Sequence, residues 1–138
     1  MTSADDIADG VVAMLNALET SIAFQAVNPP NVPEIDREVN DATVQVYPFE
    51  ETEEPTDRGD MVKATRVVSV IVQAPLKTDR ARKDCIAWLN ELKAAFTEQT
   101  ISGYRWGGNT TDSLYDFDAM AQKRQFLSVF KATFFSFE

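Results

Sequence analysis

One stretch of the chain, residues 47–62, gathers acidic side chains of the kind that bind metal ions or transfer protons. Its sequence, YPFEETEEPTDRGDMV, holds six carboxylates and one arginine in sixteen positions. A divalent site needs carboxylates whose spacing converges on one point, whereas like charges on a flexible backbone repel one another. This spacing does not converge, so the sequence favours a solvated loop over a metal site. The carboxylates are Glu50, Glu51, Glu53, Glu54, Asp57 and Asp60.

A second set of carboxylates lies further along the chain. Asp116 and Asp118 share one face if their segment is extended, and Asp112 is close to them in sequence. Three such side chains suit Mg²⁺ or Ca²⁺, but no EF-hand spacing accompanies them, so a solvated edge strand and turn is favoured. A metal-dependent enzyme that uses this trio stays open as an alternative.

The residue types that most enzymes use are missing from the sequence. It contains no histidine, which is the commonest general base and the commonest transition-metal ligand. It contains neither a G-x-x-x-x-G-K-[ST] loop nor a G-x-G-x-x-G loop to hold phosphate. The single cysteine, Cys85, falls in a helical pattern and is expected to be a buried apolar residue. We therefore expect no enzyme activity and no cofactor.

Two short motifs would matter only outside a cytoplasm. The tripeptide RGD at residues 58–60 spells an adhesion motif, and NTT at 109–111 matches a glycosylation sequon. The N-terminal residues 1–6 are acidic where a secretory signal is basic, and no continuous apolar run follows them. One cysteine alone also excludes an intrachain disulfide. The sequence predicts folding in a cytoplasm, with neither motif in use.

Length, composition and charge limit the class of protein. At 138 residues the chain fits one compact domain, residues 1–138. Hydrophobic residues make up 44% and charged residues 25%, which is ordinary for a globular protein, and no apolar run approaches the ~20 residues that span a bilayer. The formal net charge of -9 repels polyphosphates. We expect neither membrane association nor tight binding of DNA.

The first half of the chain has helical and extended patterns in turn. Ser3 suits the N-cap of a helix, which Gly10 weakens without cancelling its pattern. Three prolines between residues 29 and 33 then force an extended loop, preceded by a short strand at about 24–27. Two strands, ATVQVYP and KATRVVSVIVQAP, follow as an antiparallel pair joined by the acidic segment. The apolar positions of the helix are Ile7, Val11, Met14, Leu15, Leu18 and Ile22.

The second half continues with a helix and three extended segments. Thr78 or Asp79 caps the helix, and GYRWGGNTT gives a short strand that stops at a turn over residues 107–109. SLYDFD is a candidate partner strand, and QFLSVFKATFFSF is apolar on both alternating faces, so we expect an oligomer interface to add cover. The helix stripe is Cys85, Leu89, Leu92 and Phe96, and the two faces of the last strand are Phe126, Phe130 and Phe134, and Leu127, Val129, Phe135 and Phe137.

These elements occur in the order α-β-β-β-α-β-β-β. Runs of strands between helices predict an α+β fold with a mostly antiparallel sheet of four to six strands, a mixed sheet being the alternative, packed against two main helices. The acidic segment at about 48–62 is expected to be a mobile hairpin loop, longer than the two to five residues that hairpins prefer. Loops of that length commonly carry function.

Taken in order, these patterns resemble one family. The chain has an N-terminal amphipathic helix, a strand ending in VQVYP, an acidic loop with an arginine, the strand RVVSVIVQAPL, the helix DCIAWLNELKAAF and the strand FLSVFKATFFSF. This layout is similar to that of the small tail-terminator and neck proteins of tailed bacteriophages. The resemblance covers most of the chain and rests on V-x-V-x-P followed by a V-x-V-x-V strand, not on an invariant signature.

The resemblance implies a structural virion protein without enzyme activity. Proteins of that family form a ring, commonly a hexamer, that caps the tail tube and offers a docking face to the head connector or stopper protein. It further implies that DNA passes through the ring without specific binding, in a virion tail or neck that is assembled in the host cytoplasm. An acidic inner surface would suit that passage, because attraction to DNA needs Lys and Arg.

The family has no motif that fixes functional residues, so the interface candidates come from the residues alone. They belong to the acidic segment and to the aromatic C-terminal strand. The alternative function is a non-catalytic binding or assembly adaptor whose acidic segment attracts a basic partner. The candidate interface residues are Phe49, Glu50, Glu51, Glu53, Glu54, Arg58, Met61, Phe134, Phe135 and Phe137.

Overall fold

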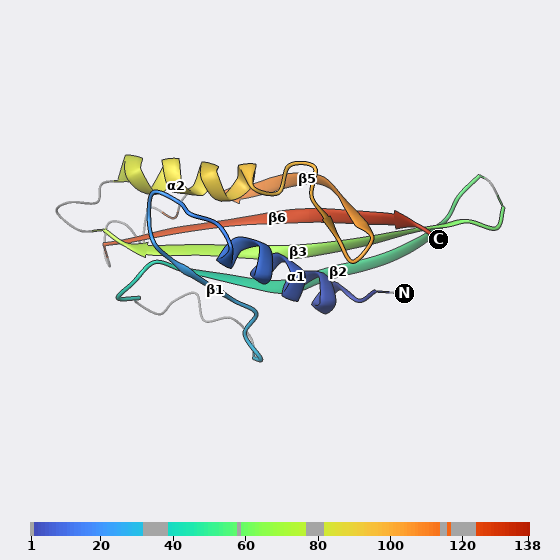
Figure 1. The fold of residues 1–138 in the computed structure, drawn as a ribbon, viewed down its shortest axis with the longest axis horizontal. Coiled ribbons are helices and arrows are strands. Elements are labelled where there is room, and N and C mark those ends of the chain that lie inside the picture. Colours follow the sequence, from blue (N-terminus) through green and yellow to red (C-terminus); the bar gives the residue numbers. More distant parts are fainter. Residues whose placement is uncertain (1, 32–38, 58, 77–81, 114–115, 117–123) are drawn as a thin grey trace.

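The structure is a computed structural model of the chain, and it describes all residues except 1, 32–38, 58, 77–81, 114–115 and 117–123. Two helices and six strands follow one another in the order expected from the sequence (Figure 1). They are α1 (Ala4–Asn16), β1 (Gln25–Val27), β2 (Thr43–Pro55), β3 (Val62–Pro75), α2 (Arg82–Ala94), β4 (Thr100–Ile101), β5 (Tyr104–Ser113) and β6 (Gln125–Phe137).

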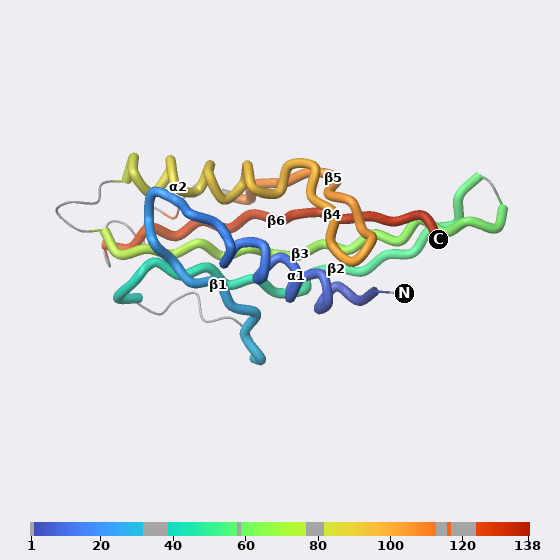
Figure 2. The backbone as a smooth tube through the Cα atoms, in the orientation of Figure 1, coloured from blue at the N-terminus to red at the C-terminus, as the bar shows by residue number. Residues whose placement is uncertain are grey.

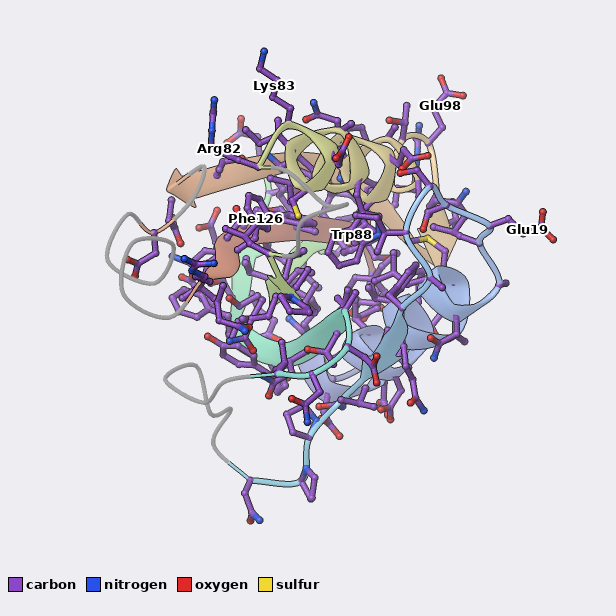
Figure 3. The ribbon with its side chains drawn as sticks, turned by 90° about the vertical axis from the view of Figure 1, so that its left-hand side faces the viewer. Glu19, Arg82, Lys83, Trp88, Glu98 and Phe126 are labelled. Carbon is purple, nitrogen blue, oxygen red and sulfur yellow. The ribbon has the colours of Figure 1, made fainter. Side chains whose placement is uncertain are left out.

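The strands form a single mixed sheet in the order β1-β2-β3-β6-β5-β4. Among the described strands, only the short β1 pairs in parallel, with the start of β2, and the other pairs are antiparallel. The α+β fold class predicted from the sequence is thus confirmed, as is the short strand near residues 24–27. Seen end-on, the sheet curls around a core into which Trp88 and Phe126 point, while Lys83 points outward (Figure 3).

Helix α1 begins where the sequence predicts and ends earlier than its apolar pattern suggests. The Ser3 side chain accepts a hydrogen bond from the Asp6 backbone, and the Asp6 side chain accepts one from Ser3, which completes a capping box. The helix ends at Asn16, whose side chain exchanges two hydrogen bonds with the backbone of Ala26 and holds β1 against it. The expected stripe positions Leu18 and Ile22 therefore lie beyond the helix.

Helix α2 buries the predicted stripe, broadened by Trp88. Its cap, expected at Thr78 or Asp79, lies outside the described residues. Phe96 follows in the turn after the helix, fully buried, and its ring meets that of Phe130 edge-on at 5.8 Å. Of the helices that the structure describes, none is both long and apolar enough to cross a membrane.

The acidic hairpin differs from the expected long loop. Strand β2 continues through the acidic residues to Pro55, still paired with β3, so the connection is only the tip loop, residues 56–61. The ladder persists because alternate residues of β3 pack inward, with Ala64 and Arg66 both buried. The prediction of a loop over residues 48–62 was wrong for residues 48–55, where pairing to a well-anchored neighbour outweighs low strand propensity.

The glycine pair at 107–108 also differs from the prediction, since it is no turn. Strand β5 runs through it with a register shift between Trp106 and Gly108. A Cβ on Gly107 would lie 2.9 Å from the Phe135 ring, so the glycine permits close packing of the two strands. Gly108 has φ 141°, a conformation that side chains disfavour. The signal interpreted as a turn is a β-bulge. The expected partner strand SLYDFD lies mostly outside the described residues.

Gly10 allows α1 to pack against β4, and its replacement is a sharp test of that contact. A Cβ at Gly10 would overlap Cγ2 of Ile101, a branched side chain with little freedom to move. Alanine gains about 1 kcal/mol in helix propensity, but we expect the clash to outweigh this gain and Gly10→Ala to destabilise the fold by about 1–2 kcal/mol. Urea unfolding measures the change. In an Ile101→Ala background the same substitution should become stabilising, and stabilisation in the wild-type chain would contradict the packing.

Candidate functional site

The sheet has one face covered by helices and a second, outer face. Register alternation assigns Val70 and Phe130 to the covered face, where both are fully buried, and assigns Ile71 and Val129 to the outer face. Both described helices pack on the covered face, and their apolar residues share one core with it. The outer face is therefore the surface on which a partner can meet the sheet.

One end of the outer face is closed within the subunit. Ile71 and Leu127 are only 2% and 8% exposed. There the Gln125 side chain donates to the Val39 carbonyl and accepts from the Val39 amide, at 3.2 and 3.3 Å. Val39, shortly before β2, is thereby fixed against this end of the sheet.

From the middle of the sheet, next to Ile71, to the tip loop, the outer face stays open. We call its apolar residues the open patch: Tyr47, Phe49, Val67, Val129, Phe135 and Phe137. Phe49 and Phe137 are 50% and 53% exposed, and these two are the large aromatic side chains most exposed among the described residues. A surface of this character is typical of a protein–protein contact.

Two lysines lie over aromatic rings of the open patch. The Lys131 ammonium is 4.2 Å from the centroid of Phe49, and that of Lys63 is 5.4 Å from the centroid of Phe135. Lys131 also pairs with Asp112 at 3.3 Å. Arg105 lies on the same outer face, opposite Phe135 in the register, and is exposed. In a protein of net charge -9, this patch combines aromatic surface with cations.

The hairpin is anchored to the body by a buried arginine. Arg66 is 2% exposed and its guanidinium donates to the carboxylate of Glu53 at 2.6 Å. It also donates to three backbone carbonyls, those of Thr2 at 2.8 Å, Thr65 at 3.0 Å and Thr52 at 3.4 Å. One cation thus joins the N-terminal segment to both arms of the hairpin, and burial without such partners would be costly.

Tyr104 continues this polar network towards the C-terminus. The Arg66 guanidinium lies 5.6 Å from the centroid of its ring, and its hydroxyl donates to Glu138 at 3.3 Å. Burial raises the pKa of Tyr104, and the nearby Glu138 carboxylate adds to the rise while the positive charge of Arg66 opposes it. The hydroxyl therefore stays neutral and acts as a donor near pH 7. Such a network holds segments together and offers no group poised for proton transfer.

The free edge of β2 is protected against further strand pairing. Val62 exchanges backbone hydrogen bonds with Glu138, the residue that follows β6, so alternate residues of β3 bond towards β6 and the others bond to β2. Val62 and Val68 belong to the residues of β3 that bond towards β6, and their partners on β2 are Pro55 and Pro48. The backbone nitrogens of these two prolines therefore point away from β3, along the free edge of β2. Proline has no N–H to donate, so this edge is unsuited to a continuous added strand.

A hollow opens at the root of the tip loop. It is lined by Thr56, Asp57, Met61 and Phe137 and measures about 480 Å³. The tip closes on itself, because the Thr56 amide and hydroxyl both donate to the Met61 carbonyl. Figure 2 shows the tip projecting past the rest of the body. Met61 and Phe137 make the hollow largely apolar, Asp57 also lines it, and its size suits a large side chain.

The predicted interface residues that the structure describes separate into three groups. Phe49, Met61, Phe135 and Phe137 belong to the open patch or the hollow, and Glu50 and Glu54 are exposed on the same face. Glu51 and Glu53 are engaged inside the subunit, with the Ala4 amide and with Arg66. Phe134 is fully buried in the core and its ring contacts Phe96, so it is no surface residue and leaves the candidate set. Arg58 lies outside the described residues.

The aspartates considered for a metal do not gather around one point where they are described. Asp112 pairs with Lys131, and the Asp116 amide donates to the Leu127 carbonyl. Asp118 lies outside the described residues. Across the part of the chain that the structure covers, no group of three acidic, histidine or cysteine side chains is arranged to hold a metal.

The sequence did not single out Lys63, Arg66, Arg105 and Lys131. Each stands alone among apolar or polar neighbours, and only strand register reveals that three of them share the outer face while Arg66 points inward. Of these four residues, only Arg66 could have been recognised from the sequence, as an arginine at an inward position of a buried strand. It becomes visible once the alternation of Ala64, Val68 and Val70 is extended through residue 66.

Comparison with known proteins assigns no family to the chain. A scan against models of protein families finds no match, and a search of curated proteins finds none. The chemical character of the exposed surfaces is consequently the guide to function.

Proposed function

We propose that the protein is a structural subunit of a bacteriophage tail or neck, forming a ring, commonly a hexamer, that terminates the tail tube and joins it to the head connector or stopper protein. In this role it has no enzyme activity and needs no cofactor. DNA passes through the ring without specific binding, and the protein resides in the virion after assembly in the host cytoplasm.

The open patch is the observation that carries this proposal. Both described helices cover one face of the sheet, and the second face keeps Phe49 and Phe137 about half exposed at the end that bears the projecting tip. A subunit whose sheet is covered by helices on one face and exposes apolar side chains on the other is suited to bind copies of itself. The element order, together with the family resemblance of the sequence, favours a ring at a tail end over other assemblies.

The acidic hairpin supports a second candidate, an assembly adaptor without catalytic function. Glu50, Glu54, Asp57 and Asp60 are exposed along one arm and its tip. Such a group favours a basic partner through an attraction that salt weakens. Replacing these four residues by Gln or Asn should then abolish binding of that partner, with no effect on the oligomeric state of the protein itself.

Electron microscopy of phage particles made without this protein tests the proposed function. We expect tails of abnormal length or tails without heads, and restoration of normal particles when the protein is supplied in trans. A complementing chain with the substitution Lys83→Glu, on exposed helix surface far from the open patch, serves as control and should restore them fully. Normal, infectious particles in the absence of the protein would refute the role.

A further inference from the structure

We propose that two subunits join by inserting Phe49 and Lys131 of one copy into the tip hollow of the next, with Lys131 facing Asp57. This contact rests on the proposed function, since it specifies how neighbouring subunits meet. Phe49 and Lys131 form a knob, the hollow supplies the receiving surface, and both belong to the same chain. The occupant of the hollow is therefore a second copy.

The knob consists of an aromatic ring and a cation held together. Phe49 is the extra residue at the register shift of β2 between Pro48 and Glu50, and the bulge leaves its ring half exposed. The Lys131 ammonium lies 4.2 Å from the centre of this ring. A partner that covers the ring therefore meets a positive charge that is shared with the partly exposed carboxylate of Asp112, 3.3 Å from the ammonium.

The hollow has the matching character. Met61 and Phe137 give it apolar walls, and Phe137 is the most exposed large apolar side chain among the described residues. Asp57 also lines the hollow and is itself exposed, so an acidic residue lies beside the apolar walls. Its volume of about 480 Å³ leaves room for one aromatic ring with the end of a lysine. Apolar surface thus meets apolar surface, and carboxylate meets ammonium.

Geometry makes this contact one between copies and gives it a direction. The hollow lies at the root of the tip, whereas Phe49 lies further down β2, where Pro48 pairs with Val68 and Glu50 with Val67. Two different surfaces of the chain meet, so the contact repeats from copy to copy and closes into a ring when the rotation per subunit allows. The prolines at the edge of β2 disfavour a competing mode of association at that edge, the addition of a continuous strand.

Charge-swap variants test the contact. Asp57→Lys and Lys131→Glu each place like charges in the interface, and we expect each to weaken self-association by roughly 100-fold or more. Phe49→Ala removes the ring and should weaken it by roughly 10-fold or more. Sedimentation equilibrium of the purified chain at low salt gives these values. Glu19→Lys and Lys83→Glu carry the same charge changes on exposed surface elsewhere and should leave association unchanged.

A mixture of the two charge-swap variants gives the decisive test of the contact. In a mixture of the Asp57→Lys and Lys131→Glu chains, contacts between unlike chains pair opposite charges, so the mixture should assemble with the two chains in equal numbers while each alone does not. The chain that carries both substitutions should also associate. Circular dichroism and urea midpoints close to wild type show that each variant is folded.

Three results would overturn the inference: a wild-type chain that stays monomeric at millimolar concentration, single variants that associate as the wild type does, or a mixture that fails to assemble although its components are folded. Failure of the proposed function has a different signature. If particles lacking the protein are normal while the charge swap behaves as expected, the contact stands and the phage role falls. If particles are defective and the charge swap has no effect, the phage role stands and the proposed contact is wrong.

Discussion

Phe96→Ala should lower the free energy of unfolding by about 3–5 kcal/mol, the range expected when a fully buried aromatic ring is removed from a core. Phe96 is fully buried, and its ring meets Phe130 at 5.8 Å edge-on and Phe134 at 6.2 Å. Removing the ring leaves a cavity between α2 and β6 that rigid neighbours cannot fill. A domain of this size has only on the order of 7–20 kcal/mol in total, so the loss is a large part of its stability.

Urea unfolding followed by circular dichroism measures this loss. Phe137→Ala is the matched control, because it deletes the same ring from a position that is 53% exposed, and it should cost less than ~1 kcal/mol. A double-mutant cycle between Phe96 and Phe130 should give a coupling of about 0.5–1.5 kcal/mol. Equal losses for Phe96→Ala and Phe137→Ala would contradict the placement of β6 between a covered and an outer face.

Arg66→Met should lower the free energy of unfolding by about 2–4 kcal/mol. The substitution keeps an apolar stem of similar length but removes the donors that serve Glu53 and three backbone carbonyls. The Glu53 side chain is 43% exposed, so water recovers part of its solvation and keeps the loss below that of a fully buried pair. The N-terminal segment and the hairpin should loosen together, because the same cation holds both.

Two measurements separate this role from a general packing defect. Glu53→Gln keeps an acceptor for Arg66 and should cost about 1 kcal/mol or less. Arg66→Met should raise the pKa of Tyr104 further, because the positive charge of Arg66 opposes the rise that burial causes. Absorbance at 295 nm as a function of pH reports this change. A Tyr104 pKa that does not move would show that Arg66 is not beside the ring.

The raised pKa of Tyr104 also makes the stability of the fold depend on pH in one direction. Because folding raises the pKa of Tyr104, the favourable contribution of its neutral form is complete below the ordinary tyrosine pKa and is lost as the pH rises through the higher folded value. The hydrogen bond to Glu138 therefore weakens only in alkaline solution.

Strand register explains which parts of the candidate surface were predictable. Alternation along QFLSVFKATFFSF predicted two apolar faces, and Phe130 and Phe135 do lie on opposite sides of the sheet. Phe134 was wrongly predicted to be an interface residue. Alternation shows that Phe134 and Phe135 lie on opposite faces of the sheet, but it does not show which of these faces the helices cover. The cations around the open patch were missed for a related reason, since residues distant in sequence become neighbours only through pairing.

Local sequence determined the capping box at Ser3, the buried stripe of α2, the order of the elements and hence the α+β class, because each depends on residues a few positions apart. Tertiary structure decided the rest. It extended β2 through the acidic residues, converted the glycine pair into a bulge, buried Arg66 and left Phe49 half exposed beside Lys131. The physical reason is that these outcomes depend on what lies across the ladder and behind the sheet, where pairing and burial outweigh the propensity of any short segment.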